Sequence, residues 1–207
     1  MIKNIVFDMG RVLIAWDPPR LIARLGYSGE DADRLLREVF SCAEWQGLDR
    51  GRLSPEEALA TMLPRLPSHL HEAAEHFVRA WWVEDLWPIE GMAELVREVK
   101  ALGYGVYLCS NATSCLHQYF DRIPGSECFD GKIVSADWKM LKPQREIYDT
   151  LFREYSLDPA ECFFIDDNPA NVEAGMMLGM DGAVFFRDMT RLRAELIAAG
   201  IPVHPCF

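Results

Sequence analysis

The stretch "NIVFDMGRVL" (residues 4–13) places an aspartate directly after a short apolar run, with a glycine two positions later. The run Ile5–Phe7 is typical of a strand that is covered on both faces, as parallel strands in α/β proteins are. In an open parallel sheet, ligands bind just beyond the carboxyl ends of the strands. Asp8 therefore occupies a position where a functional side chain is expected.

Three later runs have the same character, "GVYLCS" (105–110), "CFFID" (162–166) and "AVFF" (183–186). Amphipathic helical patterns lie beside them, "GMAELVREVKALG" (91–103), "PQREIYDTLFREY" (143–155) and "NVEAGMMLGM" (171–180). Gly103 suits the end of the first helix, because glycine readily adopts the left-handed C-cap conformation. This alternation predicts an α/β fold with a doubly wound parallel sheet (Rossmann-like).

The segment 17–87 interrupts the alternation, because it shows helical patterns and no strand pattern. The helical patterns are "DADRLLREVF" (31–40), "SPEEALATML" (54–63) and "HEAAEHFVRAWW" (71–82). Ser54 followed by Pro55 and then by Glu57 is a typical helix start. Prolines near both ends of the segment suit hinge-like connections. We expect a core domain of residues 1–16 and 88–207 and a small α-helical cap domain of residues 17–87.

Composition excludes several classes of partner. The 207 residues carry a formal net charge of −11 and contain no Lys/Arg run, so neither nucleic acid nor an anionic membrane is expected as a partner. No apolar window is long enough for a membrane span, and no signal peptide is recognisable. We expect a cytoplasmic protein, a monomer or a weak homodimer. The cysteines lack metal-ligand spacing and are predicted to be reduced thiols: Cys42, Cys109, Cys115, Cys128, Cys162 and Cys206.

Polar residues gather where the predicted strands end. They are Asp8, Ser110-Asn111 and Asp166-Asp167, and Lys142 lies between the predicted strands 105–110 and 162–166. Three carboxylates at one edge of a sheet repel each other unless a cation lies among them. Mg²⁺ takes oxygen ligands of this kind, usually together with a substrate phosphate. A lysine adds charge that a phosphate can use, so the set suits phosphoryl transfer, with a carboxylate as possible nucleophile.

Four motifs in order carry a family resemblance: "VFDMGRVL", "LCSNAT", "MLKPQREIY" and "FFIDDNPANVEAG". Over nearly its full length the chain resembles the haloacid dehalogenase superfamily of phosphatases, whose small cap domain the helical segment resembles. It is similar to bacterial sugar-phosphate phosphatases, including α-D-glucose-1-phosphate phosphatase, and to the N-terminal phosphatase domain of soluble epoxide hydrolase. The resemblance implies a Mg²⁺-dependent phosphatase that hydrolyses a small phosphorylated metabolite, with a sugar phosphate expected, through an aspartyl-phosphate.

The resemblance also implies roles for single residues. Asp8 would be the nucleophile and a Mg²⁺ ligand. The backbone carbonyl of Gly10 and the Asp167 carboxylate would bind the metal directly, and Asp166 would bind it directly or through water. Phosphate oxygens would be held by the Ser110 hydroxyl and the Asn111 backbone N–H. Lys142 would neutralise the transferring phosphoryl group and hold the nucleophile in place.

Gly10 departs from the superfamily's usual DxDxT/V motif, whose second aspartate is the general acid/base. Loss of such a group typically costs about 10²–10⁴-fold in rate unless something replaces it. Asp17 is a candidate replacement, and it is equally suited to initiating a helix before Pro18. The departure keeps open a catalytically weak protein that binds a phospho-ligand. A dehalogenase or a phosphotransferase on the same scaffold is a further alternative.

The predicted cap carries candidates for substrate contact. Its tryptophans could stack on a sugar ring or belong to the core; they are Trp45, Trp81, Trp82 and Trp87. The stretch "EWQGLDRGRLS" (44–54) is predicted as a loop between two cap helices. The comparable loop in the superfamily faces the site, which makes Asp49, Arg50 and Arg52 candidates. Asn171 is expected to have a structural role.

Overall fold

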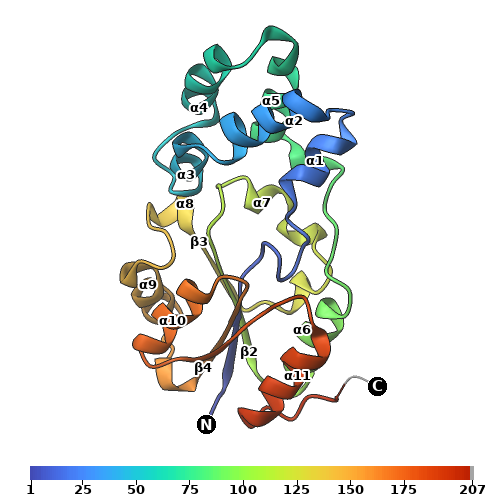
Figure 1. Ribbon diagram of the computed structural model, residues 1–207. Helices are drawn as coiled ribbons and strands as arrows, with labels where there is room; N and C mark the ends of the chain where they lie inside the picture. Colours follow the sequence, from blue (N-terminus) through green and yellow to red (C-terminus); the bar gives the residue numbers. More distant parts are fainter. Residues whose placement is uncertain (206–207) are drawn as a thin grey trace.

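The computed structural model describes residues 1–205, and a five-stranded sheet forms its centre (Figure 1). The strands are β1 (Asn4–Phe7), β2 (Gly105–Ser110), β3 (Gly131–Val134), β4 (Cys162–Asp166) and β5 (Asp181–Val184). Their order is β3-β2-β1-β4-β5, and all four neighbouring pairs are parallel. The predicted doubly wound α/β fold is confirmed.

Two strands differ from the prediction. β3 was not expected, because its sequence "GKIV" is short and begins with two residues that lack a strand pattern. β5 begins two residues earlier than the predicted 183–186 and ends at Val184. Phe185 still donates its N–H to the Asp166 backbone oxygen (2.9 Å), whereas the Phe186 side chain is exposed. The apolar run 183–186 therefore extends two residues beyond the end of β5, and its last residue, Phe186, faces solvent.

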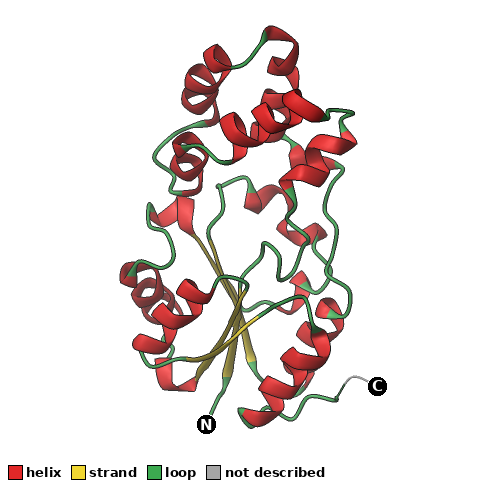
Figure 2. Ribbon diagram, viewed as in Figure 1, coloured by secondary structure: helices red, strands yellow, loops and turns green. Residues whose placement is uncertain are grey.

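Helices cover both faces of the sheet (Figures 1 and 2). α6 (Met92–Ala101) and α11 (Met189–Ala198) lie on one face, and α9 (Arg145–Tyr155) and α10 (Pro169–Met177) lie on the other. Successive side chains of β1 point to opposite faces of the sheet, so Ile5 and Phe7 pack in one buried cluster and Val6 packs in the other. A strand covered on both faces is apolar throughout, which explains why β1 could be recognised from its sequence.

A group of helices lies above the carboxyl ends of the strands (Figure 1). Its α-helices are α1 (Pro18–Arg24), α2 (Gly29–Leu35), α3 (Ala43–Asp49), α4 (Pro55–Met62) and α5 (His71–Arg79), with shorter helical turns at 36–40, 63–65, 68–70 and 81–83. As predicted, residues 17–87, all of which are described, contain no strand. Apolar side chains of these helices join the same buried cluster as Ile5 and Phe7.

Local capping fixes where these helices begin. The Ser54 hydroxyl accepts from the Glu57 N–H (3.2 Å), and the Glu57 carboxylate accepts from the Ser54 N–H (2.8 Å), which completes a capping box. Asp17 accepts from the Arg20 N–H (3.3 Å) at the start of α1. Its helix-initiating interpretation therefore holds. Asp17 is not among the residues that line the cavity described below.

The prediction of a loop over residues 44–54 was wrong, because α3 continues to Asp49. The helix was not predicted from the sequence, because Gly47 is a poor helix former. A Cβ at position 47 would lie 2.7 Å from Cδ1 of Leu53, so glycine lets the returning chain pack closely on the helix. The extra helical turn determines where Asp49 lies.

Two connections join the helical group to the sheet and run side by side. The N–H of Ala15 donates to the Trp87 oxygen (2.7 Å), and the N–H of Ile89 donates to the Leu13 oxygen (3.0 Å). The division into a core of 1–16 and 88–207 and a cap of 17–87 stays a prediction. In the described part of the chain, no helix combines the length and apolar character that a membrane crossing needs.

The described cysteines are free thiols, as expected. Cys109 on β2 and Cys162 on β4 are fully buried among the strand side chains. Burial raises the pKa of Cys109 to about 12, which keeps this thiol protonated and unreactive. Cys206 lies outside the described residues.

Candidate active site

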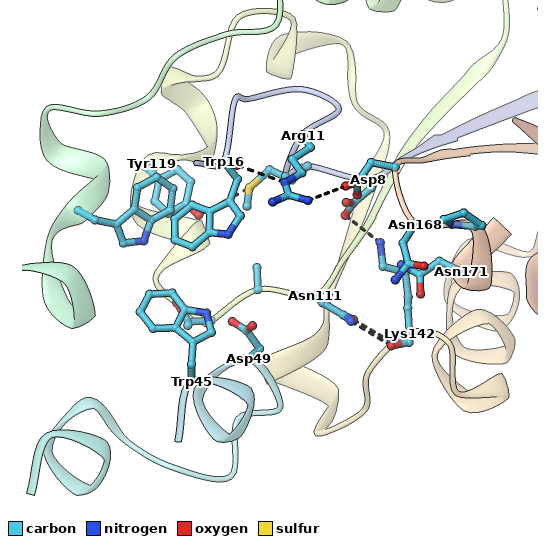
Figure 3. Close-up of a pocket in the computed structure, with 17 residues that line it drawn as sticks. Asp8, Arg11, Trp16, Trp45, Asp49, Asn111, Tyr119, Lys142, Asn168 and Asn171 are labelled. Atoms are coloured by element: carbon cyan, nitrogen blue, oxygen red, sulfur yellow. Dashed lines mark hydrogen bonds and ion pairs between the residues drawn. The ribbon is translucent and has the colours of Figure 1, made fainter. Parts of the chain in front are cut away.

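A cavity of about 530 Å³ lies between the strand ends and the helical group (Figure 3). Asp8, Asn111, Lys142 and Asp167 contribute from the sheet side. The helical side contributes two tryptophans and one aspartate, described below. The polar residues that were predicted at separate strand ends are therefore brought to one place, as the geometry of a parallel sheet requires.

Lys142 is at the centre of the polar side, with 1% of its side chain exposed. Its ammonium donates to Asp8 Oδ1 (2.8 Å), to Asp166 Oδ2 (2.6 Å) and to the Cys109 backbone oxygen (2.8 Å). Three N–H groups thus have three acceptors. Burial alone would lower the pKa of Lys142, but the charges of the two carboxylates raise it above its ordinary value. The lysine is held as a cation between them.

Asp8 follows β1 directly, and its N–H extends the ladder by donating to the Ile165 oxygen (2.9 Å). The residue is 7% exposed. Burial raises the pKa of Asp8 to about 6; Lys142 opposes the shift, and the charge of Asp166 adds to it. Without the lysine this carboxylate would be still harder to keep ionised. Lys142 therefore maintains the charged form that a nucleophile needs.

Asp166 ends β4, is completely buried and accepts hydrogen bonds on both of its carboxylate oxygens. Its Oδ1 accepts from the Asn168 N–H (2.8 Å) and the Asn171 amide (3.1 Å). Its Oδ2 accepts from Lys142 (2.6 Å) and from the same amide (3.1 Å). Both oxygens of Asp166 are therefore already hydrogen-bonded to N–H donors. Asn171 has the structural role that was expected, which is to hold Asp166.

Asp167 is half-buried beside Arg11, whose Nη1 lies 3.6 Å from Asp167 Oδ2. Burial raises the pKa of Asp167, the charge of Asp166 adds to the shift, and Arg11 opposes it. Arg11 was not identified from the sequence. Its backbone has a φ of 61°, and its Nε donates to the Trp16 oxygen (3.4 Å). This left-handed turn brings an exposed arginine to the edge of the cavity.

Three carboxylates provide a donor set for a divalent cation. One oxygen each from Asp8, Asp166 and Asp167 lies within 4.8 Å of the others. Hard cations such as Mg²⁺ prefer oxygen ligands of this kind. Gly10 also lines the cavity, and an added Cβ there would find its nearest atom, Cβ of Trp16, at 3.5 Å. Position 10 therefore has room for a Cβ.

The two predicted phosphate contacts differ in their surroundings. Asn111 lines the cavity, and its side chain accepts from the Lys142 N–H (2.8 Å) and donates to the Lys142 oxygen (3.0 Å). It thereby fixes the backbone of the central lysine. Ser110 is 1% exposed and is not among the cavity-lining residues. Its contact with phosphate stays a prediction.

Aromatic rings form the opposite wall of the cavity (Figure 3). Trp16 lies 4.5 Å from Trp81 and 5.6 Å from Trp45 between ring centroids, and Tyr119 lies 5.6 Å from Trp81. Trp45 and Trp81 were candidates for this position. Trp16 and Tyr119 were missed, because they belong to the segments that follow β1 and β2 and only the fold brings them together. We call these four residues the aromatic wall.

Of the remaining candidates, Asp49 lines the cavity and four others do not: Trp82, Trp87, Arg50 and Arg52. Trp82 stacks on Tyr119 (5.4 Å between centroids), and Trp87 lies under the Arg20 guanidinium (3.8 Å). Both therefore have packing roles. Asp49 reaches the cavity because it is the last residue of α3, whereas the chain after it turns away.

Comparisons with known proteins agree with this geometry. A family model of haloacid dehalogenase-like hydrolases matches residues 2–179. The chain is 30% identical over 181 residues to the sesquiterpene phosphatase astK of Aspergillus oryzae, covering 87% of this chain and 88% of that protein. It is 27% identical over 194 residues to the D-ribitol-5-phosphate phosphatase of Bacteroides thetaiotaomicron, covering 87% and 90%.

Solved structures share the fold. A haloacid dehalogenase family enzyme from Bacteroides thetaiotaomicron, in complex with magnesium and inorganic phosphate, superposes with a TM-score of 0.70 at 22% identity, covering 93% of this chain and 99% of that chain. The L-2-haloacid dehalogenase from Xanthobacter autotrophicus gives 0.65 at 17% identity, covering 97% and 84%. The family match and the phosphatase relatives together establish that the chain belongs to the haloacid dehalogenase-like hydrolases and is an enzyme of the phosphoric monoester hydrolase class.

Proposed function

We propose that the protein is a Mg²⁺-dependent phosphatase that hydrolyses a small phosphorylated metabolite through an aspartyl-phosphate on Asp8. The observation that carries this proposal is the buried arrangement in which Lys142 bonds both Asp8 and Asp166 beside a third carboxylate. Such a site combines a positioned nucleophile with groups that neutralise charge, and phosphoryl transfer depends mainly on these two factors. We also propose that residues 17–87 act as a cap on the core formed by 1–16 and 88–207.

The donor set suits Mg²⁺, and we assign the metal to Asp8, Asp167 and the Gly10 carbonyl. Asp166 is better suited to positioning than to direct coordination, because four hydrogen bonds from N–H donors already occupy its oxygens. When bound, Mg²⁺ would neutralise charge on the phosphoryl group and on the nucleophile. The magnesium and phosphate in the related structure from Bacteroides thetaiotaomicron are consistent with this assignment.

The chain's own residues have distinct tasks in the proposed reaction. Lys142 bonds one oxygen of Asp8 and leaves the other to attack phosphorus. Asn111 fixes the lysine backbone, and its own N–H, with the Ser110 hydroxyl, would hold phosphate oxygens. The alcohol leaves in the first step, and water hydrolyses the phospho-aspartate in the second. The cap would exclude bulk water during both steps.

We propose two candidate classes of leaving group. A sugar phosphate is the class expected from the sequence, and the ribitol-phosphate phosphatase among the relatives is consistent with it. The aromatic wall favours a second class, the monoester of an apolar alcohol, because aromatic rings gain free energy by burying apolar surface. The sesquiterpene phosphatase among the relatives is consistent with this class.

The test is phosphate release from a panel of sugar phosphates, prenyl phosphates and an aryl phosphate, with Mg²⁺ and with EDTA. Asp8→Asn is compared with Asp33→Asn, which makes the same change at an exposed position on α2. Turnover that needs both Mg²⁺ and Asp8, with Asp33→Asn unaffected, supports the proposal. Absence of turnover from protein that binds Mg²⁺ would favour a phospho-ligand binding protein. Halide release from a 2-haloacid in EDTA would favour a dehalogenase, and phosphoryl transfer to an added alcohol a phosphotransferase.

A further inference from the structure

Gly10 leaves the reaction without the general acid/base that the family's usual motif supplies, and the cavity contains one carboxyl group that the mechanism above does not use. We propose that Asp49, at the end of α3, protonates the leaving oxygen and then activates the hydrolytic water. This inference rests on the proposed aspartyl-phosphate mechanism. It makes the helical cap a supplier of a catalytic group as well as a cover.

The position of Asp49 suits this role. It lines the cavity between the aromatic wall and the polar strand ends, so it lies beside the space that a leaving group would fill (Figure 3). Within the described residues, no lysine, arginine or histidine forms an ion pair with it. The two cations that line the same cavity are already engaged, Lys142 with Asp8 and Arg11 with Asp167.

The surroundings favour the protonated form of Asp49, which is the form that a general acid needs. Burial raises the pKa of Asp49 to about 8; the charge of Asp8 adds to the shift and Trp45 opposes it. The residue also ends a helix, where the negative end of the helix dipole disfavours a second negative charge. A carboxyl group with a pKa near the working pH can both give and accept a proton.

The backbone of Asp49 is fixed against the sheet side. Ser135 begins the helical turn α8 (Ser135–Trp138) after β3. Its hydroxyl donates to the backbone oxygen of Asp49 (2.5 Å) and accepts from the Ala112 N–H (2.9 Å). Gly51 packs so closely that a Cβ there would overlap the Ala136 backbone oxygen. These contacts hold the end of α3, and with it the backbone of Asp49, against the helical turn that follows β3.

The proposed proton transfers balance. In the first step the phosphorus–oxygen bond of the ester breaks, a bond from phosphorus to an Asp8 oxygen forms, and the Asp49 proton moves to the leaving oxygen. Asp49 is then a carboxylate. In the second step it takes a proton from water, whose oxygen attacks phosphorus, and the bond to Asp8 breaks. Inorganic phosphate leaves, and both aspartates return to their starting forms.

The test compares leaving groups in Asp49→Asn with those in wild type. An alkyl alkoxide needs a proton to leave, whereas p-nitrophenolate leaves without one. We expect Asp49→Asn to lower single-turnover phosphorylation from an alkyl phosphate by about 10²–10⁴-fold and to affect p-nitrophenyl phosphate much less. Since the variant also lacks the base, p-nitrophenyl phosphate should give a stoichiometric burst of nitrophenolate and trapped phospho-enzyme. Asp33→Asn is the matched control.

A second variant distinguishes loss of a proton donor from structural damage caused by Asp49→Asn. Gly10→Asp restores an acid at the family's usual position, where the structure has room for a Cβ. Added to Asp49→Asn, it should recover at least a tenth of the lost alkyl-phosphate turnover. Equal losses with both leaving groups, no burst and no rescue would overturn the role of Asp49. If wild type itself shows no turnover that depends on Asp8, the proposed function fails instead.

The pH profile gives an independent readout. The titratable groups that share the cavity with Asp49 are Asp8, Arg11, Tyr119, Lys142 and Asp167. Burial raises the pKa of Tyr119, and the pKa of Lys142 is raised as well, so both titrate above their ordinary ranges. An acid that must be protonated predicts that kcat/KM falls as the pH rises through about 8. This alkaline limb should disappear in Asp49→Asn, and its persistence there would contradict the proposal.

Discussion

Replacing Lys142 with methionine tests the central electrostatic arrangement through stability alone. The substitution keeps the length and approximate volume of the side chain and removes the charge. In the metal-free protein it leaves Asp8 and Asp166, which are 7% and 0% exposed, facing each other without a cation. The ammonium's three hydrogen bonds, at 2.6–2.8 Å, are lost together.

The magnitude follows from burial. Breaking a buried ion pair by removing one partner costs about 3–5 kcal/mol, because the remaining charge is neither solvated nor compensated. For a protein of this size, 1 kcal/mol shifts the melting temperature by about 2–4 °C, so we expect a decrease of roughly 6–20 °C. Lys139→Met removes an exposed lysine three positions earlier. It should change the unfolding free energy by no more than about 0.5 kcal/mol.

Urea denaturation in EDTA, followed by tryptophan fluorescence and circular dichroism, measures both variants. Because the charge of Lys142 opposes the upward shift of the Asp8 pKa, loss of the lysine raises the folded-state pKa of Asp8 further above its unfolded value. The penalty is therefore fully present above the folded pKa and is relieved as the pH falls through it. The gap between Lys142→Met and wild type should narrow from pH 7 to pH 5. A gap below about 1 kcal/mol at pH 7, or one that widens at low pH, would refute the reasoning.

Three further predictions follow from the same structure. In Gly51→Ala the new Cβ would overlap the Ala136 backbone oxygen and displace the end of α3, so kcat/KM should fall by roughly 10²-fold. Gly29→Ala is the control, because Gly29 has a similar φ but open space around it, and it should leave steady-state activity unchanged. Ser54→Ala removes the capping box of α4 and should cost about 1 kcal/mol in urea denaturation, with activity retained. Mg²⁺ at 100 times its Kd should stabilise the metal-free protein by about 2.7 kcal/mol in a thermal melt, and no stabilisation would contradict the metal assignment.

The sequence predicted the fold and most of the polar site because both depend on local patterns. Buried parallel strands are apolar throughout, and their carboxyl ends meet at one edge of the sheet. An aspartate after the first run and an aspartate pair after another could therefore be placed together without coordinates. Lys142 could be added because its motif, "MLKPQREIY", is the third of four motifs that occur in the order found in the haloacid dehalogenase superfamily. The structure brings these groups together around the lysine ammonium.

Features that depend on contacts between distant segments could not be read in this way. β3 and the end of β5 lack a distinctive pattern, because edge strands are covered less completely than central ones. Trp16 and Tyr119 come from two separate connections and meet only across the cavity. Asp166 is suited to positioning and Asp167 to metal binding, because only Asp166 accepts hydrogen bonds from Lys142 and from Asn171 on α10.

Asp49 illustrates the division most clearly. The sequence marked it as a candidate on a loop, whereas the structure makes it the last residue of a helix whose Gly47 lies against Leu53. Its chemistry depends on burial and on the charge of Asp8, and its backbone is held by the Ser135 hydroxyl from the helical turn after β3. Residue type and strand order determined which groups could meet at the site. Tertiary packing decided which of them are solvated, paired or left protonated, because those properties depend on neighbours that are distant in sequence.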